Sequence, residues 1–271
     1  SFGGDLYFLD EIPSPAENEP YYEPVRRVLE QYDDELIAAE RAFLLLLSAF
    51  RKPVGQYEME RIFRANTYAG AINKPVAALS ETEYQALLKR MHAFRLVRHA
   101  LTEEEAYTLH PLIKAHYSSR LDQCSMGQLE DLYNDIGNCY LALAGDVPEY
   151  PELDDLQPLF DAIHYYCKAG VYQEAFDLMY EKVYQETRFV LTNQLGAHDI
   201  AYELALKFFP DGDITQPALI DDSHRLRWIL NTIGLGLMSL GRLREAVPFY
   251  ERANVIQLKQ EDWQNASVTY N

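Results

Sequence analysis

The spacing of small residues near the end of the chain leaves few folds open. Gly234, Ala246 and Ala253 lie in a helical pattern that runs from Leu230 to Leu258, with a break at Gly241. Small side chains at these positions let two antiparallel helices approach closely, because the distance between packed helices depends on the side chains at the contact. Larger side chains at helical spacing would fill the remaining space: Leu230, Ile233, Leu237 and Tyr250. The segment therefore predicts two helices joined by a short turn.

This spacing is typical of the tetratricopeptide repeat (TPR), in which helix pairs of about 34 residues stack on one another. A weaker copy, from Leu159 to Lys182, places Gly170 where the clear copy has its turn glycine. Further copies near Gly196 and Gly137 are more degenerate. Because such a helix pair buries its apolar face only against its neighbours, we predict a stack of TPR-like α–α superhelical repeats over residues 126–271.

The preceding residues predict a smaller module made first of helices. Residues 11–24 hold four prolines among acidic residues, which rules out a regular helix and indicates a linker. Apolar residues three or four apart then predict a helix over 25–47, and a shorter helix follows over 57–65. Ser80 and Glu83 have the spacing of a capping box, which predicts the start of a third helix.

A change of period after the third helix predicts a small hairpin. Residues 94–99 and 106–109 are compatible with two short strands on either side of an acidic turn. Pro111 suits the first turn of a closing helix, where its missing N–H would have no partner. Three helices, a hairpin and a closing helix are typical of a winged helix, which we predict over residues 25–121. The predicted fold class is mainly α, a winged-helix-like module followed by TPR-like repeats.

The charge balance limits the partners that the chain can bind. The chain carries 42 acidic residues against 24 basic ones. Binding to nucleic acid or to anionic lipid needs clustered Lys and Arg, so this balance argues against a general affinity for either. Three cysteines without paired spacing favour a reducing, cytoplasmic setting, and the apolar runs are too short for a membrane span. Local basic residues between 85 and 120 favour contacts with the acidic remainder of the protein over a DNA groove. They are Lys89, Arg90, Arg95, Arg98, Lys114 and Arg120.

Three segments together resemble a known family. They are Arg41-Ala-Phe-Leu-Leu-Leu-Leu-Ser-Ala-Phe50, Leu109-His-Pro-Leu-Ile113 and Gly241-Arg-Leu-Arg-Glu-Ala246. In this order they are similar to the part of bacterial STAND signalling NTPases (NB-ARC-like) that follows the nucleotide-binding core. The resemblance implies a winged helix followed by a TPR-like sensor, and it covers the chain from about Val28.

The same resemblance implies a role for one histidine. In that family a His at the start of the last winged-helix helix senses the phosphate of the bound nucleotide, and His110 is the residue that matches. The chain lacks the Gly-x-x-x-x-Gly-Lys-Ser/Thr loop that cradles phosphates, so the resemblance places the ATPase, with its ADP or ATP and Mg, before Ser1. Residues 1–24 would then be the linker from that module. It also implies contact with that NTPase core, and oligomerisation on activation.

The first helix of each TPR-like pair would line a groove for a protein or peptide ligand. Counting from the small-residue positions, the groove-facing residues are Phe160 and His164 in the weaker copy and Trp228, Asn231, Leu235 and Met238 in the clear copy, with Gln157 and Cys167 beside the former. Aromatic, Met and amide side chains suit a peptide partner. The alternative is that these residues pack on the next helix pair.

No set of residues in the sequence predicts a catalytic or metal site. His164 and Cys167 form a single candidate ligand pair, and zinc sites need more ligands than that. Neighbouring acids such as Asp154-Asp155 are interpreted as solvated, since nothing places them beside a nucleophile. We therefore expect no enzyme activity and no cofactor in this chain.

Three functions remain after these exclusions. The first is the regulatory, ligand-sensing segment of a STAND-type ATPase. The second is a DNA-binding transcription regulator with a TPR effector domain, and the third is a free-standing TPR interaction scaffold. A phosphate-binding loop before Ser1 would favour the first, and an initiator Met close to Ser1 would favour the third.

Overall fold

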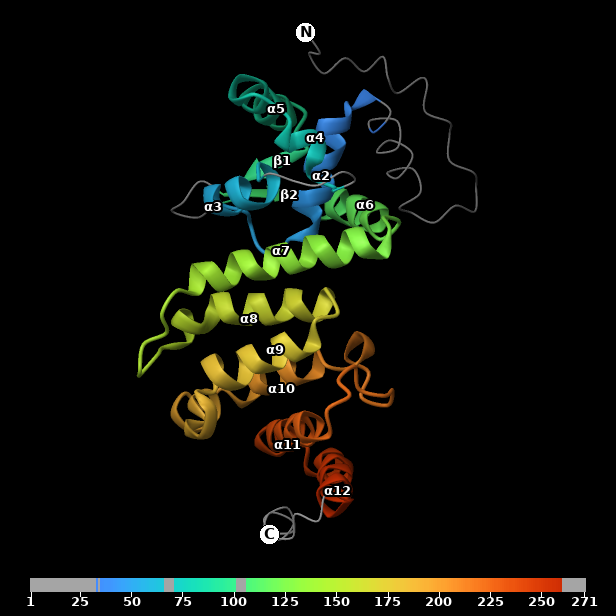
Figure 1. Ribbon diagram of the computed structural model, residues 1–271. Coiled ribbons are helices and arrows are strands. Elements are labelled where there is room, and N and C mark those ends of the chain that lie inside the picture. Colours follow the sequence, from blue (N-terminus) through green and yellow to red (C-terminus); the bar gives the residue numbers. More distant parts are fainter. Residues whose placement is uncertain (1–32, 34, 66–70, 101–105, 260–271) are drawn as a thin grey trace. The chain divides into compact units, whose positions relative to one another are not determined.

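The computed structural model describes residues 33, 35–65, 71–100 and 106–259 (Figure 1). The fold is mainly α, with one two-stranded sheet in the described ranges. Two compact units divide the chain, the first up to Leu129 and the second from Glu130. None of the described helices is both long and apolar enough to cross a membrane.

The first unit consists of short helices and one hairpin. Its elements are α2 (Ala38–Ala49), α3 (Gln56–Glu58) continuing as the π-helical η2 (Met59–Phe63), α4 (Lys74–Ala77), α5 (Glu81–Ala93), β1 (Val97–His99), β2 (Tyr107–Leu109) and α6 (Pro111–Leu121). Its core lies around Phe43, where the Phe63 ring packs at a centroid distance of 5.1 Å. The predicted linker 1–24 lies outside the described residues.

The helix predicted over 25–47 is interrupted within its described part, and residues 25–32 lie outside the described residues. Among the described residues, the chain bends at Leu36, and α2 begins at Ala38. The Glu40 carboxylate accepts a hydrogen bond from the Ile37 N–H (3.0 Å), and this bond satisfies a free donor at the start of α2. Apolar spacing does not report such a break, because Leu36 at the bend is buried like the apolar residues of α2.

Two carboxylates of this region are buried and paired. Asp33 is 3% exposed, accepts a hydrogen bond from Tyr117 Oη (2.8 Å) and forms an ion pair with Arg120. Glu40 is 1% exposed and pairs with Arg90 at 3.1 Å. Two of the locally clustered basic residues thus neutralise buried acids of the same unit, where an unpaired charge would be costly.

The predicted hairpin is confirmed. Strands β1 and β2 pair antiparallel, with Val97 opposite Leu109 and His99 opposite Tyr107. A third segment joins this sheet at an isolated bridge, because Val54 and Tyr107 exchange main-chain hydrogen bonds of 2.9 and 2.8 Å. The hairpin is therefore tied to the segment between α2 and α3.

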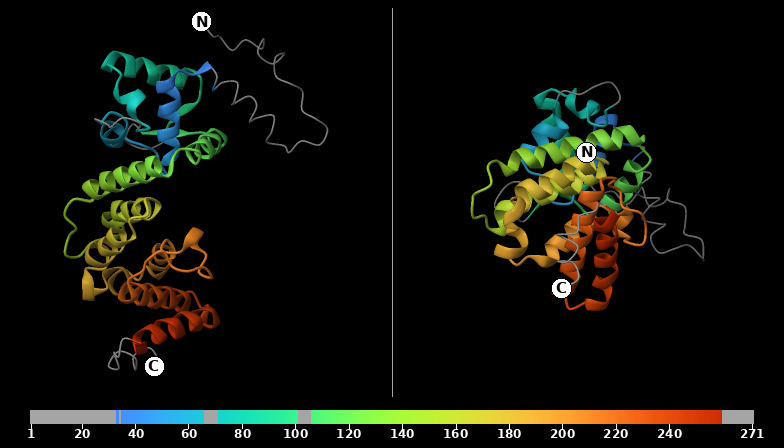
Figure 2. Two further views of the ribbon diagram at one scale, coloured as in Figure 1. Left: turned by 45° about the vertical axis from the view of Figure 1, so that its right-hand side comes forward. Right: turned by 60° about the horizontal axis from the view of Figure 1, so that its bottom comes forward.

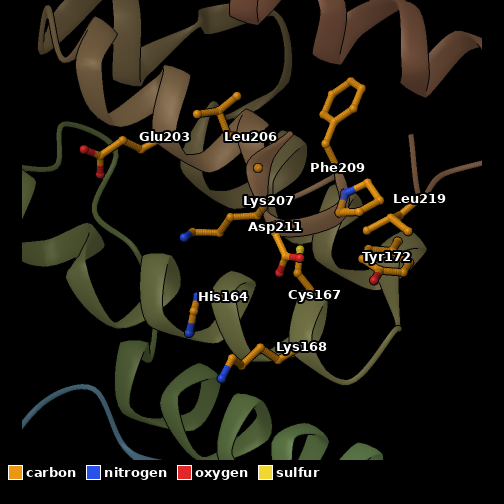
Figure 3. A pocket seen from close by; sticks show the side chains of 12 residues that line it. His164, Cys167, Lys168, Tyr172, Glu203, Leu206, Lys207, Phe209, Asp211 and Leu219 are labelled. Atoms are coloured by element: carbon orange, nitrogen blue, oxygen red, sulfur yellow. The ribbon is translucent and has the colours of Figure 1, made fainter. Parts of the chain in front are cut away.

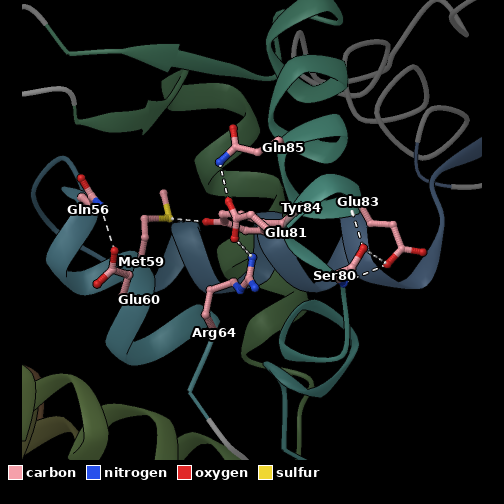
Figure 4. A network of polar contacts seen from close by, with 9 residues as sticks. All are labelled: Gln56, Met59, Glu60, Arg64, Ser80, Glu81, Glu83, Tyr84 and Gln85. Carbon is pink, nitrogen blue, oxygen red and sulfur yellow. Dashed lines mark hydrogen bonds and ion pairs between the residues drawn. The ribbon is translucent and has the colours of Figure 1, made fainter.

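The predicted capping box is also confirmed (Figure 4). The N–H of Glu83 donates to Ser80 Oγ, and the Glu83 carboxylate accepts from the Ser80 N–H at 2.8 Å. The Ser80 hydroxyl also donates to the Glu83 carboxylate at 2.6 Å, and this bond, together with the one from the Ser80 N–H, lowers the pKa of Glu83. Beside them, Arg64 pairs with Glu81 at 3.0 Å and lies 4.6 Å from the ring centroid of Tyr84, so the end of η2 is held to the start of α5.

The second unit consists of helices throughout its described part. Its elements are α7 (Met126–Ala144, which begins just before the division), α8 (Leu153–Lys168), α9 (Tyr172–Leu178) continuing as η3 (Met179–Val183), η4 (Glu186–Arg188), η5 (Val190–Gln194), α10 (His198–Leu206), η6 (Pro210–Gly212), α11 (Ser223–Ser239) and α12 (Leu243–Lys259). Figure 2 shows α11 and α12 side by side, as predicted for the clear copy of the repeat. Ala246 and Ala253 are buried there, at 1% and 0% exposure.

The two predicted turn glycines adopt the same geometry. Gly170 and Gly241 both have φ of +76°, a conformation that favours glycine. In each case the next residue donates its N–H to the carbonyl five positions earlier: Val171 to Tyr166 (3.0 Å) and Arg242 to Leu237 (2.8 Å). This is the Schellman closure of a helix, so both helix pairs turn in the same way.

The turn at Gly196, in the degenerate middle copy, differs from these two. Gly196 also has a positive φ of +64°. Ala197, however, donates to the carbonyl of Leu191, six positions earlier, because the preceding helix η5 is a π-helix. Helix α10 nevertheless packs against α11, so the stack of helices continues through this irregular unit.

Candidate functional site

His110 lies at the residue that begins α6. Its backbone is extended (φ −61°, ψ 141°), and Nδ1 accepts a hydrogen bond from the Leu112 N–H at 3.3 Å. Because Nδ1 uses its lone pair as an acceptor, a neutral imidazole carries its proton on Nε2. The side chain is half-buried, so His110 acts as a helix cap that keeps one donor for another group.

The predicted groove residues fall into several environments. Phe160 is 8% exposed and belongs to the core, while Leu235 and Met238 are 37% and 45% exposed. Asn231 is half-buried, and its Oδ1 has no hydrogen-bond partner among the described residues. His164 lies on α8 in a different environment from the three residues on α11 and lines a pocket that they do not reach.

Trp228 packs on the preceding helix pair. Its ring makes edge-to-face contacts with Phe176, Tyr180 and Tyr184, at centroid distances of 5.5, 5.9 and 4.6 Å. Arg225, one turn earlier on α11, lies 5.3 Å from the Phe176 ring centroid. Trp228 therefore contacts the preceding helix pair, whereas the alternative given above has the groove residues packing on the next pair.

A pocket of about 640 Å³ lies within the second unit (Figure 3). Helix α8 contributes His164, Cys167 and Lys168, and α10 contributes Glu203, Leu206 and Lys207. The rest of the lining comes from Tyr172, from Phe209 to Gly212 and from Leu219. The volume is within the range of about 300–1,000 Å³ that small-molecule sites occupy.

The loop that forms one wall of this pocket is held by its own hydrogen bonds. The N–H of Leu219 donates to the Phe208 carbonyl at 2.8 Å and closes the loop at its base. Within it, the Asp213 carboxylate accepts from Thr215 and from Gln216 Nε2, and these bonds lower the pKa of Asp213. Asp211 has a positive φ of +50°, which is uncommon outside glycine.

Burial and neighbouring charges both act on the ionisable side chains that line the pocket. Burial raises the pKa of the Cys167 thiol to about 12, although the nearby Lys207 acts in the opposite direction. Burial also raises the pKa of Tyr172. Lys168 donates to Tyr133 Oη at 3.4 Å and lies 4.7 Å from that ring's centroid, so its ammonium group is anchored beside α7. Cys167 is therefore a neutral thiol in the pocket wall at physiological pH.

Two residues of this pocket, His164 and Cys167, are among those that the sequence assigned to the groove face of the weaker copy. Lys168, Lys207 and Asp211 were missed, because the contact between α8 and the end of α10 joins residues about forty positions apart. The Pro210-Asp211-Gly212 turn was the one local signal, since this composition is typical of turns. Within the described ranges, no group of three or more His, Cys, Asp or Glu could hold a metal ion.

Comparisons with known proteins give one structural likeness. No protein-family model and no curated protein sequence matches the chain. A solved structure of a Signal Transduction ATPase with Numerous Domains (STAND) protein with a tetratricopeptide repeat sensor, from Pyrococcus horikoshii, aligns with a TM-score of 0.45 and 14% identity. The alignment covers 94% of this chain and 36% of that one, so the chain spans about a third of the length of that protein.

Proposed function

We propose that the chain is the regulatory, ligand-sensing segment of a STAND-type signalling ATPase. The second unit would bind a ligand, and the first unit, as a winged-helix-like module, would control a nucleotide-binding core elsewhere in the protein. The observation that carries the proposal is the order of the units: helices and a hairpin ending in a His-capped helix, then TPR-like helix pairs. This is the order that the sequence motifs imply.

The contacts of the basic residues favour this function over the DNA-binding alternative. Arg90 and Arg120 pair with the buried acids Glu40 and Asp33. An arginine that neutralises a buried acid contributes less net positive charge towards the phosphates of DNA, and DNA affinity depends on the number of phosphates neutralised. The proposal accordingly includes no role for the first unit in reading a DNA sequence.

The capping geometry of His110 gives the proposal a specific mechanism. A helix start offers free N–H groups and positive potential to an anion. With Nδ1 accepting from Leu112, the Nε2–H of His110 could donate to a nucleotide phosphate brought to α6. Such a contact, made only in the ADP-bound off state, would hold that state until a ligand in the second unit shifts the equilibrium.

The test compares wild type with His110→Ala in the longer protein that contains the nucleotide-binding core. We expect ADP to dissociate about tenfold faster from the variant and ligand-free activity to rise, which corresponds to a contact of about 1.4 kcal/mol. His224→Ala, which removes an exposed histidine of the second unit, is the matched control. Equal ADP dissociation rates and equal basal activity would leave His110 as a structural cap.

We further propose that the chain has no catalytic centre of its own. ATP turnover by the purified 271-residue chain, lost after a point substitution within it, would contradict this.

A further inference from the structure

Three nitrogen-bearing side chains lie along one side of the α8–α10 pocket, where Figure 3 also shows the Glu203 carboxylate. His164 and Lys168 are one turn apart on α8, and Lys207 comes from the end of α10. In a chain with 42 acidic and 24 basic residues, this grouping is a local exception. These side chains can receive a carboxylate, which forms its strongest hydrogen bonds with charged donors.

The opposite side of the pocket is apolar, and a carboxylate lies between the two sides. Figure 3 shows Leu219, Tyr172 and Phe209 apart from the basic groups, with the Asp211 carboxylate beside Cys167 between them. Asp211 has a left-handed backbone and lies in the turn from Pro210 to Gly212. The Asp213 N–H donates to the Pro210 carbonyl at 2.8 Å and closes this turn. Strained residues held in this way are concentrated at binding sites.

The formal charges of the lining balance. Lys168 and Lys207 are matched by Glu203 and Asp211, so the pocket favours a ligand with no net charge over a dianion such as a phosphate. A ligand that contacts the basic side chains, the Asp211 carboxylate and the apolar side needs a carboxylate, an ammonium group and an apolar side chain. We propose that this pocket binds a free α-amino acid with an apolar or aromatic side chain.

Each group of such a ligand has a partner in the pocket. The ligand carboxylate faces Lys207 and His164, and Lys168, whose ammonium group donates to Tyr133 Oη, adds its positive charge. The ligand ammonium group faces Asp211, and the ligand side chain packs on Phe209 and Leu219. At about 640 Å³ the pocket is larger than an amino acid, so water accompanies the ligand. Only one part of this assignment rests on the proposed function, namely that the bound amino acid is the ligand that the protein senses.

A purely structural role for the lysines predicts a different result. Lys168 is the last residue of α8, and Lys207 caps the end of α10, where a cation compensates the helix dipole. In that case their neutralisation would lower stability and leave ligand binding unchanged. Binding measurements on folded variants therefore separate the two roles.

The experiment measures binding to the purified 271-residue chain by calorimetry. The probes are L-leucine, L-methionine, L-phenylalanine, L-tyrosine and L-tryptophan, together with two analogues of phenylalanine, 3-phenylpropionate without the ammonium group and phenethylamine without the carboxylate. We expect at least one amino acid to bind, and both analogues to bind about tenfold or more weakly than phenylalanine. Binding by none of the amino acids, or equal binding of an analogue, would overturn the proposal.

The variants locate the site. Lys207→Gln and Asp211→Asn are expected to weaken binding about tenfold or more, and asparagine tolerates the left-handed backbone at position 211. Lys182→Gln and Asp221→Asn remove the same charges from exposed positions outside the pocket and should leave binding unchanged. Circular dichroism establishes that each variant is folded. Unchanged affinity in both folded pocket variants would overturn the assignment.

The two proposals fail separately. Amino-acid binding that does not alter ADP release from the longer protein would refute the sensing function and leave the pocket assignment intact. An ADP response to another ligand, without amino-acid binding, would refute the pocket assignment alone.

Discussion

A side-chain carbon added to Gly236 would lie 2.7 Å from Cβ of Tyr202, and 3.2 Å from the main-chain oxygen of His198. Helices α10 and α11 therefore meet at a point where only glycine fits. The neighbouring atoms are close to the α10 backbone, so they cannot move away without moving the helix.

We expect Gly236→Ala to lower the free energy of unfolding by about 1–3 kcal/mol, as overpacking of a tight contact does. Urea denaturation followed by circular dichroism measures the change. Gly127→Ala in α7 is the control, because no atom lies within 4 Å of its added carbon, and alanine favours a helix over glycine. Equal stability of the two variants would show that α10 and α11 do not pack this closely.

At the contact of Gly234 with Tyr250, we expect an added side chain to cost less stability than at Gly236. A carbon added to Gly234 would lie 2.7 Å from Cζ of Tyr250, at the far end of a half-buried ring that can turn aside. Gly234→Ala should therefore be less destabilising than Gly236→Ala. In the Tyr250→Leu background its cost should nearly disappear, because the atoms that clash are gone. A double-mutant cycle measures this coupling, and additive effects would contradict the contact.

The buried pairing of Asp33 is expected to stabilise the first unit. Asp33→Asn removes the charge that Arg120 pairs with and weakens the bond from Tyr117, so we expect a loss of about 1–3 kcal/mol. Tyr117→Phe should cost about 1 kcal/mol and add less than its full effect to Asp33→Asn. Asp122→Asn, at an exposed neighbouring position, is the control. Full additivity would mean that the two side chains do not interact.

The buried thiol of Cys167 predicts a dependence of stability on alkaline pH. Its folded pKa, about 12, lies above the value near 9 of an exposed thiol, so the folded state holds its proton more tightly than the unfolded state. The resulting stability is fully present below pH 9 and is lost as the pH rises towards 12, by about 1.4 kcal/mol per pH unit. Burial also raises the pKa of Tyr84 and Tyr184, which acts in the same direction at higher pH.

The measurement is the free energy of unfolding in urea at pH 8, 9 and 10. Cys167→Ala is expected to lower stability at pH 8, and to show a smaller loss between pH 9 and 10 than the wild type. Cys124→Ala is the control, because that thiol is only partly buried. Identical slopes in the wild type and Cys167→Ala would show that Cys167 titrates at its ordinary pKa.

The sequence by itself determined the local features of this protein. The turn glycines Gly170 and Gly241, the capping box of Ser80 and Glu83, and the helix start at Pro111 all depend on neighbours within a few residues, so their patterns could be read directly. The small residues of the α11–α12 pair could also be predicted, because a repeat prescribes the partner helix along with the spacing.

Only the tertiary structure decided which distant residues meet. Apolar spacing did not distinguish Phe160, which is buried, from Leu235 and Met238, which are exposed, because burial depends on the neighbouring helix. The bonds of Asp33 with Tyr117 and Arg120 of α6 join residues far apart in the chain, and so does the pocket between α8 and the end of α10. Such contacts follow from packing across elements, which a local pattern does not encode.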